Sequence, residues 1–489
     1  MSSRAAVKGS PTRPLPLHFR HLGGLMRIPT LLVALAACSS ALAAAGPPAP
    51  GQDWFAAHRA ALAAKLPPDA VVVLRAPAEP PGNLLDAYRP DSNVWYLTGF
   101  SEPDAIAVFR PGALEGKRYT LFVKPKSWAE ERWTGRRVGV EGATEFRADA
   151  AYPMADFQKE SRPLLAGAKA LYYVDARDKD FREKLLSAWQ ALAAAGPEPL
   201  PVLDVAPLLG QMRLVKDATE IATLREAVRL SVEAHRAALT RARPGVNEGV
   251  LKAVMVERCL AGGSARMAYA PIVGSGPNSV ILHYPDANRT MLAGEMIVND
   301  TACEYGLYAA DVTRSYPVSG TFSPEQRALY AIVLAAQKAG IAKAAPGARH
   351  HEIQDAAYEV IVDGLLKLGL LKGTREEVKT SRSFAAFFPH GVSHWLGLDV
   401  HDAGSYEFGD PKDRWTRYFS SNATLRPGMV LTVEPGIYVP EKSEGVDPKW
   451  WNIGMRIEDD VLVTEKGPEC LSCAAPREIA DVEKAMAVH

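Results

Sequence analysis

The sequence predicts a mixed α/β (α+β) chain that folds into two domains. Its 489 residues exceed the usual size of one domain, and a hydrophobic content of 47% is sufficient for two cores. In residues 52–208, apolar strand-like runs at 71–74 and 119–123 alternate with helical stretches such as the alanine-rich one near 182–195. In residues 213–485, helices alternate with runs typical of antiparallel strands.

Residues 1–45 are typical of an export signal. Residues 28–45 are almost wholly apolar and small, follow Arg27, and are too short to span a bilayer comfortably. Two cleavage sites compete: the alanine-rich stretch 41–45 suits ordinary signal peptidase, whereas the Leu-Ala-Ala-Cys string ending at Cys38 resembles a bacterial lipobox. We therefore expect an exported, periplasmic protein that is either soluble or tethered by a lipid anchor on Cys38.

The composition indicates neither a nucleic-acid partner nor a disulfide framework. The 56 basic and 56 acidic residues of the whole chain become 51 and 56 without the leader, a net charge of −5, which does not favour nucleic-acid binding. Five cysteines are too few for a disulfide framework in a chain of this size. Cys470 and Cys473 either pair in an oxidising compartment or remain two loop thiols.

Helix signals of one kind occur twice in the second domain. Asp217 with Glu220 three residues later predicts a capped helix that runs to the Pro-Gly at 244–245. Ser323 with Pro324 predicts a second capped helix that ends before the Pro-Gly at 346–347. Each Pro-Gly precedes another helix, and this weak internal repeat suits two similar halves around one site. We expect the His-His pair at 350–351, at a helix start, to be exposed.

A β-hairpin is predicted to bring two aspartates together. Residues 296–303 and 308–318 are typical of strands, and 304–307 of a tight turn. If Tyr305 and Gly306 form the centre of the turn, Asp300 and Asp311 face each other with Cβ atoms about 4.5–5.5 Å apart. Two bare carboxylates would repel at this distance, and a cation between them removes the cost. Two metal ions about 3.5–4 Å apart would fit beside such a pair.

Three further residues complete a candidate ligand set. Glu434 follows the strand-like run 429–433, Glu458 lies in the strand-like run 455–463, and His394 lies in a glycine-rich segment. Taken singly, each carboxylate could be an ordinary residue at a strand end or on a charged edge strand. Together with Asp300 and Asp311, however, they make an oxygen-rich site that favours Mn²⁺ or another hard divalent ion over thiolate-bound Zn²⁺.

The histidine-rich segment 390–402 is the least ordinary part of the chain. It contains His390, His394 and His401, three of the eleven histidines, between glycines. Neutral imidazoles supply both metal ligands and proton donors. With His283 upstream, the segment indicates a reaction centre.

In their order and surrounding strings, these residues resemble the metal-dependent Xaa-Pro aminopeptidases (aminopeptidase P, the M24B family). This family is related to prolidase and methionine aminopeptidase and has the pita-bread fold. The resemblance covers residues 52–485 and rests on the strings at 390–402, 433–438 and 456–460 and on the spacing of the two aspartates. One departure is Asn299, where the family usually has an aliphatic residue. The resemblance implies an aminopeptidase P amino-terminal domain at 52–208 and a pita-bread catalytic domain at 213–485.

The resemblance also implies a role for each site residue. Asp311 and Glu458 would chelate two divalent ions, most simply Mn²⁺, Asp300 and His394 would each hold one ion, and Glu434 would be both ligand and proton shuttle. A metal-bridging hydroxide would be the nucleophile, with the tetrahedral intermediate and the departing nitrogen stabilised by His283 and His401. The surrounding residues that hold the proline ring or orient the ligands would be His390, Tyr438 and Arg456. Cys303 is expected to be a lone buried strand residue and not a ligand.

The first domain carries two weaker candidates. Trp95 and Arg137 lie in strings that resemble the family's amino-terminal domain, which assists oligomer formation and closure of the substrate pocket. By that resemblance they contact substrate, and otherwise they are a core aromatic and a surface base. The same resemblance implies a homodimer or homotetramer.

The sequence therefore predicts an enzyme that releases the first residue from peptides with proline second. A prolidase restricted to Xaa-Pro dipeptides is the alternative with the same chemistry. A non-catalytic pita-bread binding module is the alternative of another class, and it is disfavoured because all five ligands are present.

Overall fold

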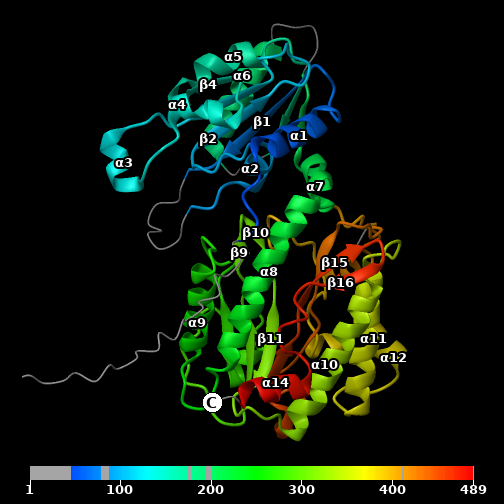
Figure 1. Cartoon of the computed structure of the whole chain (residues 1–489). Coiled ribbons are helices and arrows are strands. Elements are labelled where there is room, and N and C mark those ends of the chain that lie inside the picture. The colour runs from blue at the N-terminus through cyan, green and yellow to red at the C-terminus, as the bar shows by residue number, and fades with distance from the viewer. Residues whose placement is uncertain (1–45, 79–87, 175–177, 194–199, 410–411, 488–489) are drawn as a thin grey trace, which may run out of the picture. The chain divides into compact units, whose positions relative to one another are not determined.

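The computed structural model describes residues 46–78, 88–174, 178–193, 200–409 and 412–487. The predicted leader and its Cys38 lie outside these residues. Figure 1 labels the helices and strands along the chain. Within the described part of the chain, no helix combines the length and apolarity needed to span a bilayer.

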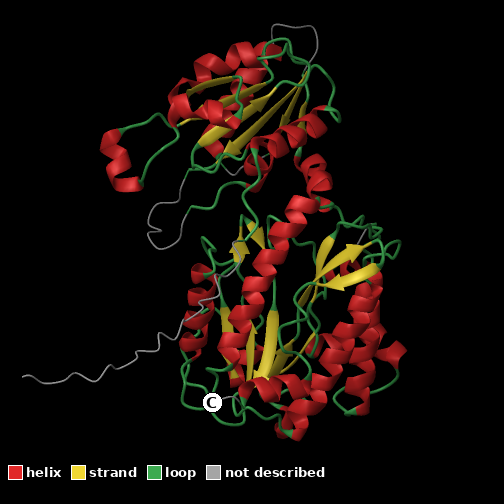
Figure 2. Cartoon of the chain, in the orientation of Figure 1, coloured by secondary structure: helices red, strands yellow, loops and turns green. Residues whose placement is uncertain are grey.

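The N-terminal region is built on one six-stranded sheet covered on both faces (Figure 2). The sheet order is β4-β3-β2-β1-β5-β6, with β1 antiparallel to β2 and parallel to β5. Its elements are α1 (Gln52–Ala63), β1 (Ala70–Ala76), α2 (Ser92–Thr98), β2 (Ala105–Phe109), β3 (Tyr119–Val123), α3 (Trp128–Thr134), α4 (Gly139–Gly142), β4 (Ala150–Pro153), α5 (Phe157–Leu165), β5 (Ala170–Tyr173), α6 (Lys179–Ala193), β6 (Val202–Asp204) and α7 (Ala206–Leu214).

Alternation along β1 explains the two covered faces. Val71 and Val73 belong to a core shared with α5 and α6, whereas Val72 and Leu74 belong to a core shared with α1 and α2. Successive strand residues point to opposite faces, so a continuous apolar run indicates a strand covered on both sides. The strand-like runs predicted at 71–74 and 119–123 are thus confirmed.

The C-terminal region surrounds small antiparallel sheets with helices. Its sheets are β11-β8-β7, β12-β15-β16, β13-β14 and the hairpin β10-β9. Its elements are α8 (Ala218–Leu239), α9 (Glu248–Ala261), β7 (Ile272–Ser275), β8 (Met296–Asp300), β9 (Glu304–Tyr305), β10 (Tyr308–Ala309), β11 (Thr313–Pro317), α10 (Pro324–Lys343), α11 (His351–Lys367), α12 (Arg375–Ser381), α13 (Arg414–Tyr418), β12 (Val430–Val433), β13 (Gly436–Val439), β14 (Ile453–Arg456), β15 (Asp459–Thr464), β16 (Gly467–Cys470) and α14 (Ile479–Met486).

The twofold helix pattern is confirmed. Asp217 caps α8 in a capping box with Glu220, and Ser323 caps α10 in a capping box with Gln326. Helices α8 and α9 pack together, as do α10 and α11. One detail differs, because α8 ends at Leu239 and not at the Pro-Gly that follows.

The predicted register of the hairpin is wrong by two residues. Tyr305 pairs with Tyr308, so the turn centres on Gly306 and Leu307. Both of these residues have positive φ, 54° and 70°, as a type I′ turn requires. Asp300 therefore pairs with Thr313, and Asp311 lies between β10 and β11.

The long predicted strands are interrupted where the site residues occur. The run 296–303 is a strand only as far as Asp300, and the run 308–318 is divided around Asp311. The run 455–463 is divided between β14 and β15, which leaves Glu458 between them. These interruptions place carboxylates at strand ends, where side chains of different sheets can converge.

Cys303 and His350 differ from expectation, whereas for Cys470 and Cys473 the structure has the paired one of the two expected alternatives. Cys303 is not a lone thiol, because it is bonded to Cys259 of α9, and Cys470 is bonded to Cys473. His350 is 6% exposed and not a surface residue. Its ring packs against Trp395, and burial lowers its pKa to about 3.

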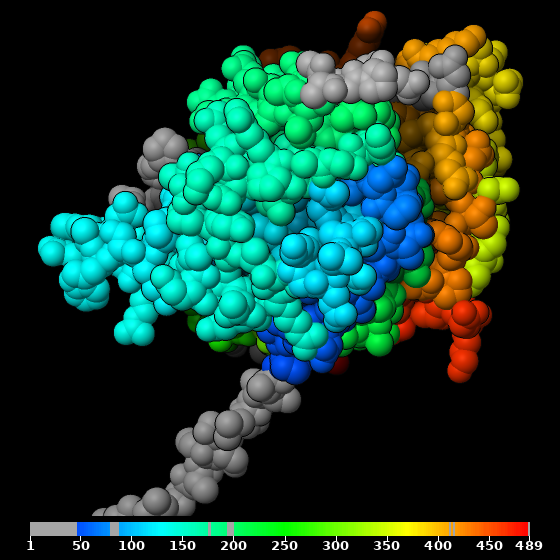
Figure 3. Space-filling model, turned by 90° about the horizontal axis from the view of Figure 1, so that it is seen from above, coloured from blue at the N-terminus to red at the C-terminus, as the bar shows by residue number. Residues whose placement is uncertain are grey.

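Helix α3 stands away from the rest of the N-terminal region (Figures 1 and 3). None of its residues is buried, and Trp128 and Trp133 are 78% and 80% exposed. Arg137 follows this helix in the chain.

Candidate active site

Three sheets and one irregular segment bring the predicted ligands together. Asp300 ends β8, Glu434 follows β12, and Glu458 lies between β14 and β15. The histidine segment runs beside β12, where Thr432 N donates to His394 O at 3.0 Å. Glu458 N donates to Thr313 O at 3.1 Å, which ties the β14–β15 connection to β11. Residues that are far apart in the sequence therefore meet at strand ends.

The closest group within this set is formed by Asp311, His394 and Glu458. One ligand atom of each lies within 4.8 Å of the others. His394 Nε2 is 3.3 Å from Asp311 Oδ2 and 3.7 Å from Glu434 Oε1. Asp311, His394 and Glu458 are nearly inaccessible to solvent, whereas the Glu434 side chain is 19% exposed.

Asp300 belongs to the same site, and both of its carboxylate oxygens accept hydrogen bonds. Its Oδ2 accepts from Arg456 Nη2 at 2.5 Å, and its Oδ1 accepts from the Tyr269 hydroxyl at 2.6 Å. The preceding Asn299, the departure noted in the sequence, is buried and donates to the Tyr316 hydroxyl. With asparagine at position 299, β8 still continues through Asp300.

The carboxylates destabilise one another electrostatically. Burial raises the pKa of Glu434 to about 7, with a further contribution from Asp311. Burial and then Asp311 and Glu434 raise the pKa of Glu458 well above its usual value. Burial alone would lower the pKa of His394, but Asp311 and Glu434 raise it to about 9. Buried like charges of this kind are costly unless a cation is present.

The group fits divalent metal ions. Glu458 Oε2 accepts from the Thr313 hydroxyl at 2.6 Å, whereas its Oε1 is buried and has no hydrogen-bond partner among the described residues. A buried carboxylate oxygen without a donor is costly. His394 Nδ1 lies 3.0 Å from Trp395 O, so the neutral ring donates there and leaves Nε2 as a ligand atom. A donor set of carboxylates and one imidazole suits hard divalent ions.

A directional chain of hydrogen bonds connects Arg456 to His390. Arg456 Nη1 donates to the Tyr438 hydroxyl at 2.7 Å, and this hydroxyl lies 2.9 Å from His390 Nε2. His390 Nδ1 is 2.8 Å from Gly391 O and donates to it, so Nε2 accepts from Tyr438. Burial and the Arg456 charge lower the pKa of His390 to about 3. These contacts place Arg456 and Tyr438 where they orient Asp300 and His390.

His401 and His283 are the accessible histidines of the site. The His401 ring stacks on His394 with centroids 4.0 Å apart and planes at 22°. Burial of the ring and the neighbouring His394 lower the pKa of His401 to about 4. His283 contributes to the lowered pKa of both His390 and His401, which places its exposed side chain near them.

A network of ion pairs centred on the buried Arg213, Lys216 and Asp402 fixes the loop that carries His401. Arg213 Nη2 donates to Asp402 Oδ1 at 2.5 Å and to Asp399 Oδ2 at 2.6 Å, and Lys216 Nζ donates to Asp402 Oδ2 at 2.9 Å. Burial alone would raise the pKa of Asp402, but Lys216 and Arg213 hold it below its usual value. Arg213 Nη1 also donates to Asn93 of α2, so the N-terminal region contributes to this network.

The two weaker candidates have no described contact with the carboxylate group. Trp95 is 7% exposed and packs edge-on against Phe55. The ring centroids of Trp95 and Tyr308 are 6.2 Å apart. This environment is that of a core aromatic. For Arg137, the described contact is a hydrogen bond from its backbone N to Oε1 of Glu131. Their role in substrate binding stays a prediction.

Sequence reasoning missed Tyr269 and Thr313. Tyr269 lies in a loop without periodicity, so no sequence signal marks its bond to Asp300. Thr313 is two residues after Asp311, and strand alternation could have placed both on one face. The incorrect hairpin register concealed this relation.

The fold and this group of side chains define a metal-dependent hydrolase. Residues 222–465 match metallopeptidase family M24, and residues 55–172 match the aminopeptidase P N-terminal domain. The chain belongs to metallopeptidase family M24, with the aminopeptidase P type of N-terminal domain. The predicted family and fold class are confirmed.

Similar proteins and structures cover most of the chain. A Xaa-Pro aminopeptidase of Haemophilus influenzae is 34% identical, with 89% of this chain and 97% of that protein aligned. One from Escherichia coli is 36% identical over 82% of this chain and 89% of that protein. The structure of Pseudomonas aeruginosa aminopeptidase PepP matches with a TM-score of 0.83 and 37% identity, covering 90% of this chain and 98% of that one. The structure of E. coli aminopeptidase P with the inhibitor Pro-Leu has a TM-score of 0.82 and 33% identity, covering 90% and 99%.

Proposed function

We propose that this chain is a metal-dependent Xaa-Pro aminopeptidase that removes the first residue from peptides with proline at the second position. The observation that carries the proposal is the buried convergence of Asp311, His394 and Glu458 in a chain of family M24. The names of the similar proteins support the choice of substrate.

The proposed ligands are those predicted from the sequence: Asp300, Asp311, His394, Glu434 and Glu458. Two divalent ions bound by them would acidify water and polarise the scissile carbonyl. We propose Mn²⁺ because the donor set has no thiolate and is mainly carboxylate oxygen. Arg456 and Tyr269 would orient Asp300, and Thr313 would orient Glu458.

Glu434 is the proposed proton acceptor. A carboxylate placed beside the reacting bond can accept a proton from water and return it to a leaving group. The Glu434 side chain is more exposed than those of Asp311 and Glu458, so it can face a substrate. Cleavage before proline releases a secondary amine, and the departing nitrogen must gain a proton that Glu434 could return.

The histidines are proposed to act as neutral donors. His401, with a pKa of about 4, is uncharged at pH 7 and can donate an N–H hydrogen bond to an oxyanion. His283, accessible and close to His401, is the proposed second contact for the reacting bond. His390 and Tyr438, already joined by a hydrogen bond, are proposed to hold the proline side of the substrate.

A peptide series tests the proposed function. Chelator-stripped protein would be assayed with Xaa-Pro, Xaa-Pro-Yaa and Xaa-Ala-Yaa, with and without added Mn²⁺. We expect Mn²⁺ to restore release of Xaa from Xaa-Pro-Yaa but not from Xaa-Ala-Yaa. Cleavage of Xaa-Pro alone would identify a prolidase, and no cleavage of any peptide would indicate the binding module. Restoration by Zn²⁺ or Co²⁺ but not by Mn²⁺ would refute the proposed metal alone.

We also propose export to the periplasm. The apolar segment after Arg27 and the two disulfides support an oxidising destination. Mass spectrometry of the mature N-terminus would distinguish cleavage near residue 45 from a lipidated Cys38, and an uncleaved chain in the cytoplasmic fraction would refute export. Light scattering would test the proposed homodimer or homotetramer.

A further inference from the structure

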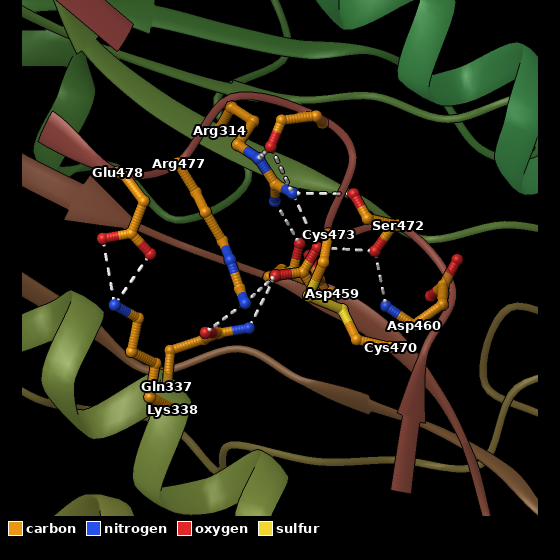
Figure 4. Close-up of a disulfide and its surroundings, with 12 residues drawn as sticks. Arg314, Gln337, Lys338, Asp459, Asp460, Cys470, Ser472, Cys473, Arg477 and Glu478 are labelled. Atoms are coloured by element: carbon orange, nitrogen blue, oxygen red, sulfur yellow. Dashed lines mark hydrogen bonds and ion pairs between the residues drawn. A yellow bond between two sulfur atoms is a disulfide. The ribbon is translucent and has the colours of Figure 1, made fainter. Parts of the chain in front are cut away.

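We propose that Ser472, held inside the Cys470–Cys473 disulfide loop, is a positioning residue for the carboxylate metal site. The inference rests on the proposed function and extends it to a residue that touches neither substrate nor metal. Cys470 ends β16, and the loop that follows returns against β15 (Figure 4). Ser472 is fully buried, although both cysteines are partly accessible.

The Ser472 hydroxyl bonds to both residues that follow Glu458. It accepts from Asp460 N at 2.9 Å and donates to Asp459 Oδ1 at 2.6 Å. The Leu471 N–H also donates to Asp460 O at 2.8 Å. The loop therefore fixes the backbone immediately after a proposed metal ligand.

Asp459 and Arg314 extend this connection to Glu458 itself. Arg314 Nη2 donates to Asp459 Oδ1 at 2.6 Å and to Ser472 O at 3.0 Å. Arg314 Nη1 donates to Glu458 O at 2.6 Å. The other Asp459 oxygen accepts from Gln337 and Arg477, so this buried carboxylate is fully satisfied (Figure 4). A satisfied buried network of this kind rigidifies the groups that it joins.

Asp460 connects the same loop to the second carboxylate. The Asp460 side chain is buried. Asp311 N donates to its Oδ2 at 3.1 Å and to its Oδ1 at 3.3 Å. The Ser472 hydroxyl accepts from Asp460 N, and the Asp460 carboxylate accepts from Asp311 N. One hydroxyl thus supports two of the three residues in the closest ligand group.

The disulfide explains why Ser472 stays in this position. Its two cysteines are three residues apart, so they enclose only Leu471 and Ser472. A ring this small leaves the enclosed backbone few alternative conformations. Opening the ring would keep the hydroxyl but allow it to leave Asp459 and Asp460.

Removal of the hydroxyl tests the proposal. Mn²⁺ binding to chelator-stripped wild type and Ser472→Ala would be measured by titration calorimetry. The kcat and KM of both proteins would be measured with Xaa-Pro-Yaa in the presence of Mn²⁺. We expect Mn²⁺ affinity to fall about tenfold to a hundredfold, as for groups that orient metal ligands. We also expect kcat to fall with little change in KM, because Ser472 touches no substrate.

A matched control separates positioning from general stability. The Thr98 hydroxyl of α2 is equally buried, accepts from Phe100 N and donates to Val94 O. Thr98→Val should lower the thermal midpoint as Ser472→Ala does but leave Mn²⁺ affinity within twofold of wild type. A Ser472→Ala affinity within twofold of wild type, or an equal loss in Thr98→Val, would overturn the proposal.

A second variant keeps the test decisive if Ser472→Ala does not fold. The double variant Cys470→Ser and Cys473→Ser retains the hydroxyl and opens the ring. A loss of Mn²⁺ affinity of at least about threefold is expected, and an unchanged affinity would overturn the proposal. Wild type that binds Mn²⁺ but cleaves no Xaa-Pro-Yaa would refute the proposed function, while the comparison of affinities would still test positioning.

Discussion

Replacing Glu434 by glutamine should stabilise the metal-free protein while it abolishes activity. The pKa of Glu434 rises from 4.5 to about 7, mainly through burial and with a contribution from Asp311. Between these values the unfolded chain has released a proton that the folded chain retains. Stability therefore falls as pH rises through this window, and the loss is complete above pH 7.

The magnitude follows from the size of the shift. Each pKa unit corresponds to about 1.4 kcal/mol, so ionisation of Glu434 costs the folded metal-free chain up to about 3 kcal/mol at pH 8. Glutamine keeps the shape and removes the charge. Glu434→Gln should recover up to this amount at pH 8 and almost nothing at pH 4.

Glu220 supplies a matched comparison away from the site. Burial also raises its pKa to about 7, but its partners are Asp217 N and the Tyr308 hydroxyl. Glu220→Gln should therefore gain a similar free energy with or without Mn²⁺. For Glu434→Gln the gain should disappear or reverse with Mn²⁺, because metal that binds only the folded chain stabilises wild type more.

Urea unfolding followed by tryptophan fluorescence, with chelator and with Mn²⁺, measures these differences. Each variant would be compared with wild type at pH 4 and pH 8. A metal-free Glu434→Gln protein less stable than wild type at pH 8 would refute the electrostatic reasoning. An equal gain in both variants with Mn²⁺ would refute the assignment of Glu434 as a ligand.

Other substitutions address the ligands, their orientation and the disulfide. Asp311→Ala should lose Mn²⁺ and activity but remain folded, and retained metal stoichiometry by elemental analysis would contradict its assignment. Arg456→Lys keeps the charge but loses the fork that reaches Asp300, so kcat should fall about tenfold to a hundredfold; unchanged steady-state kinetics would argue against orientation. Cys259→Ala with Cys303→Ala opens a loop with a sequence separation of 44, which should cost about 4 kcal/mol of stability. An unchanged thermal midpoint would show that the pairing contributes nothing.

Local signals in the sequence were sufficient for the helices and for the identity of the site. The capping boxes of α8 and α10 depend on side chains three residues apart, so the sequence alone reveals them. The histidine segment and the string around Glu458 are specific enough to indicate the metallopeptidase family. Neither conclusion depends on how distant segments pack.

Predictions that depended on strand pairing were less successful. The hairpin register was wrong because composition alone placed the turn centre at Tyr305 and Gly306, whereas the backbone conformation places it at Gly306 and Leu307. His350 was expected at the surface because the sequence does not show that Trp395 covers it. Cys303 was expected to be unpaired because its partner Cys259 lies on another element.

The sequence by itself determined the fold class, the family and the residue types of a hard-metal site, because helix caps and motif strings are local. Only the tertiary structure decided which side chains meet. Asp311, His394 and Glu458 converge because separate strands end at one place. Ser472 reaches the backbone beside two of them because a disulfide loop folds back on β15. Such contacts depend on the packing of distant segments, which no local pattern encodes.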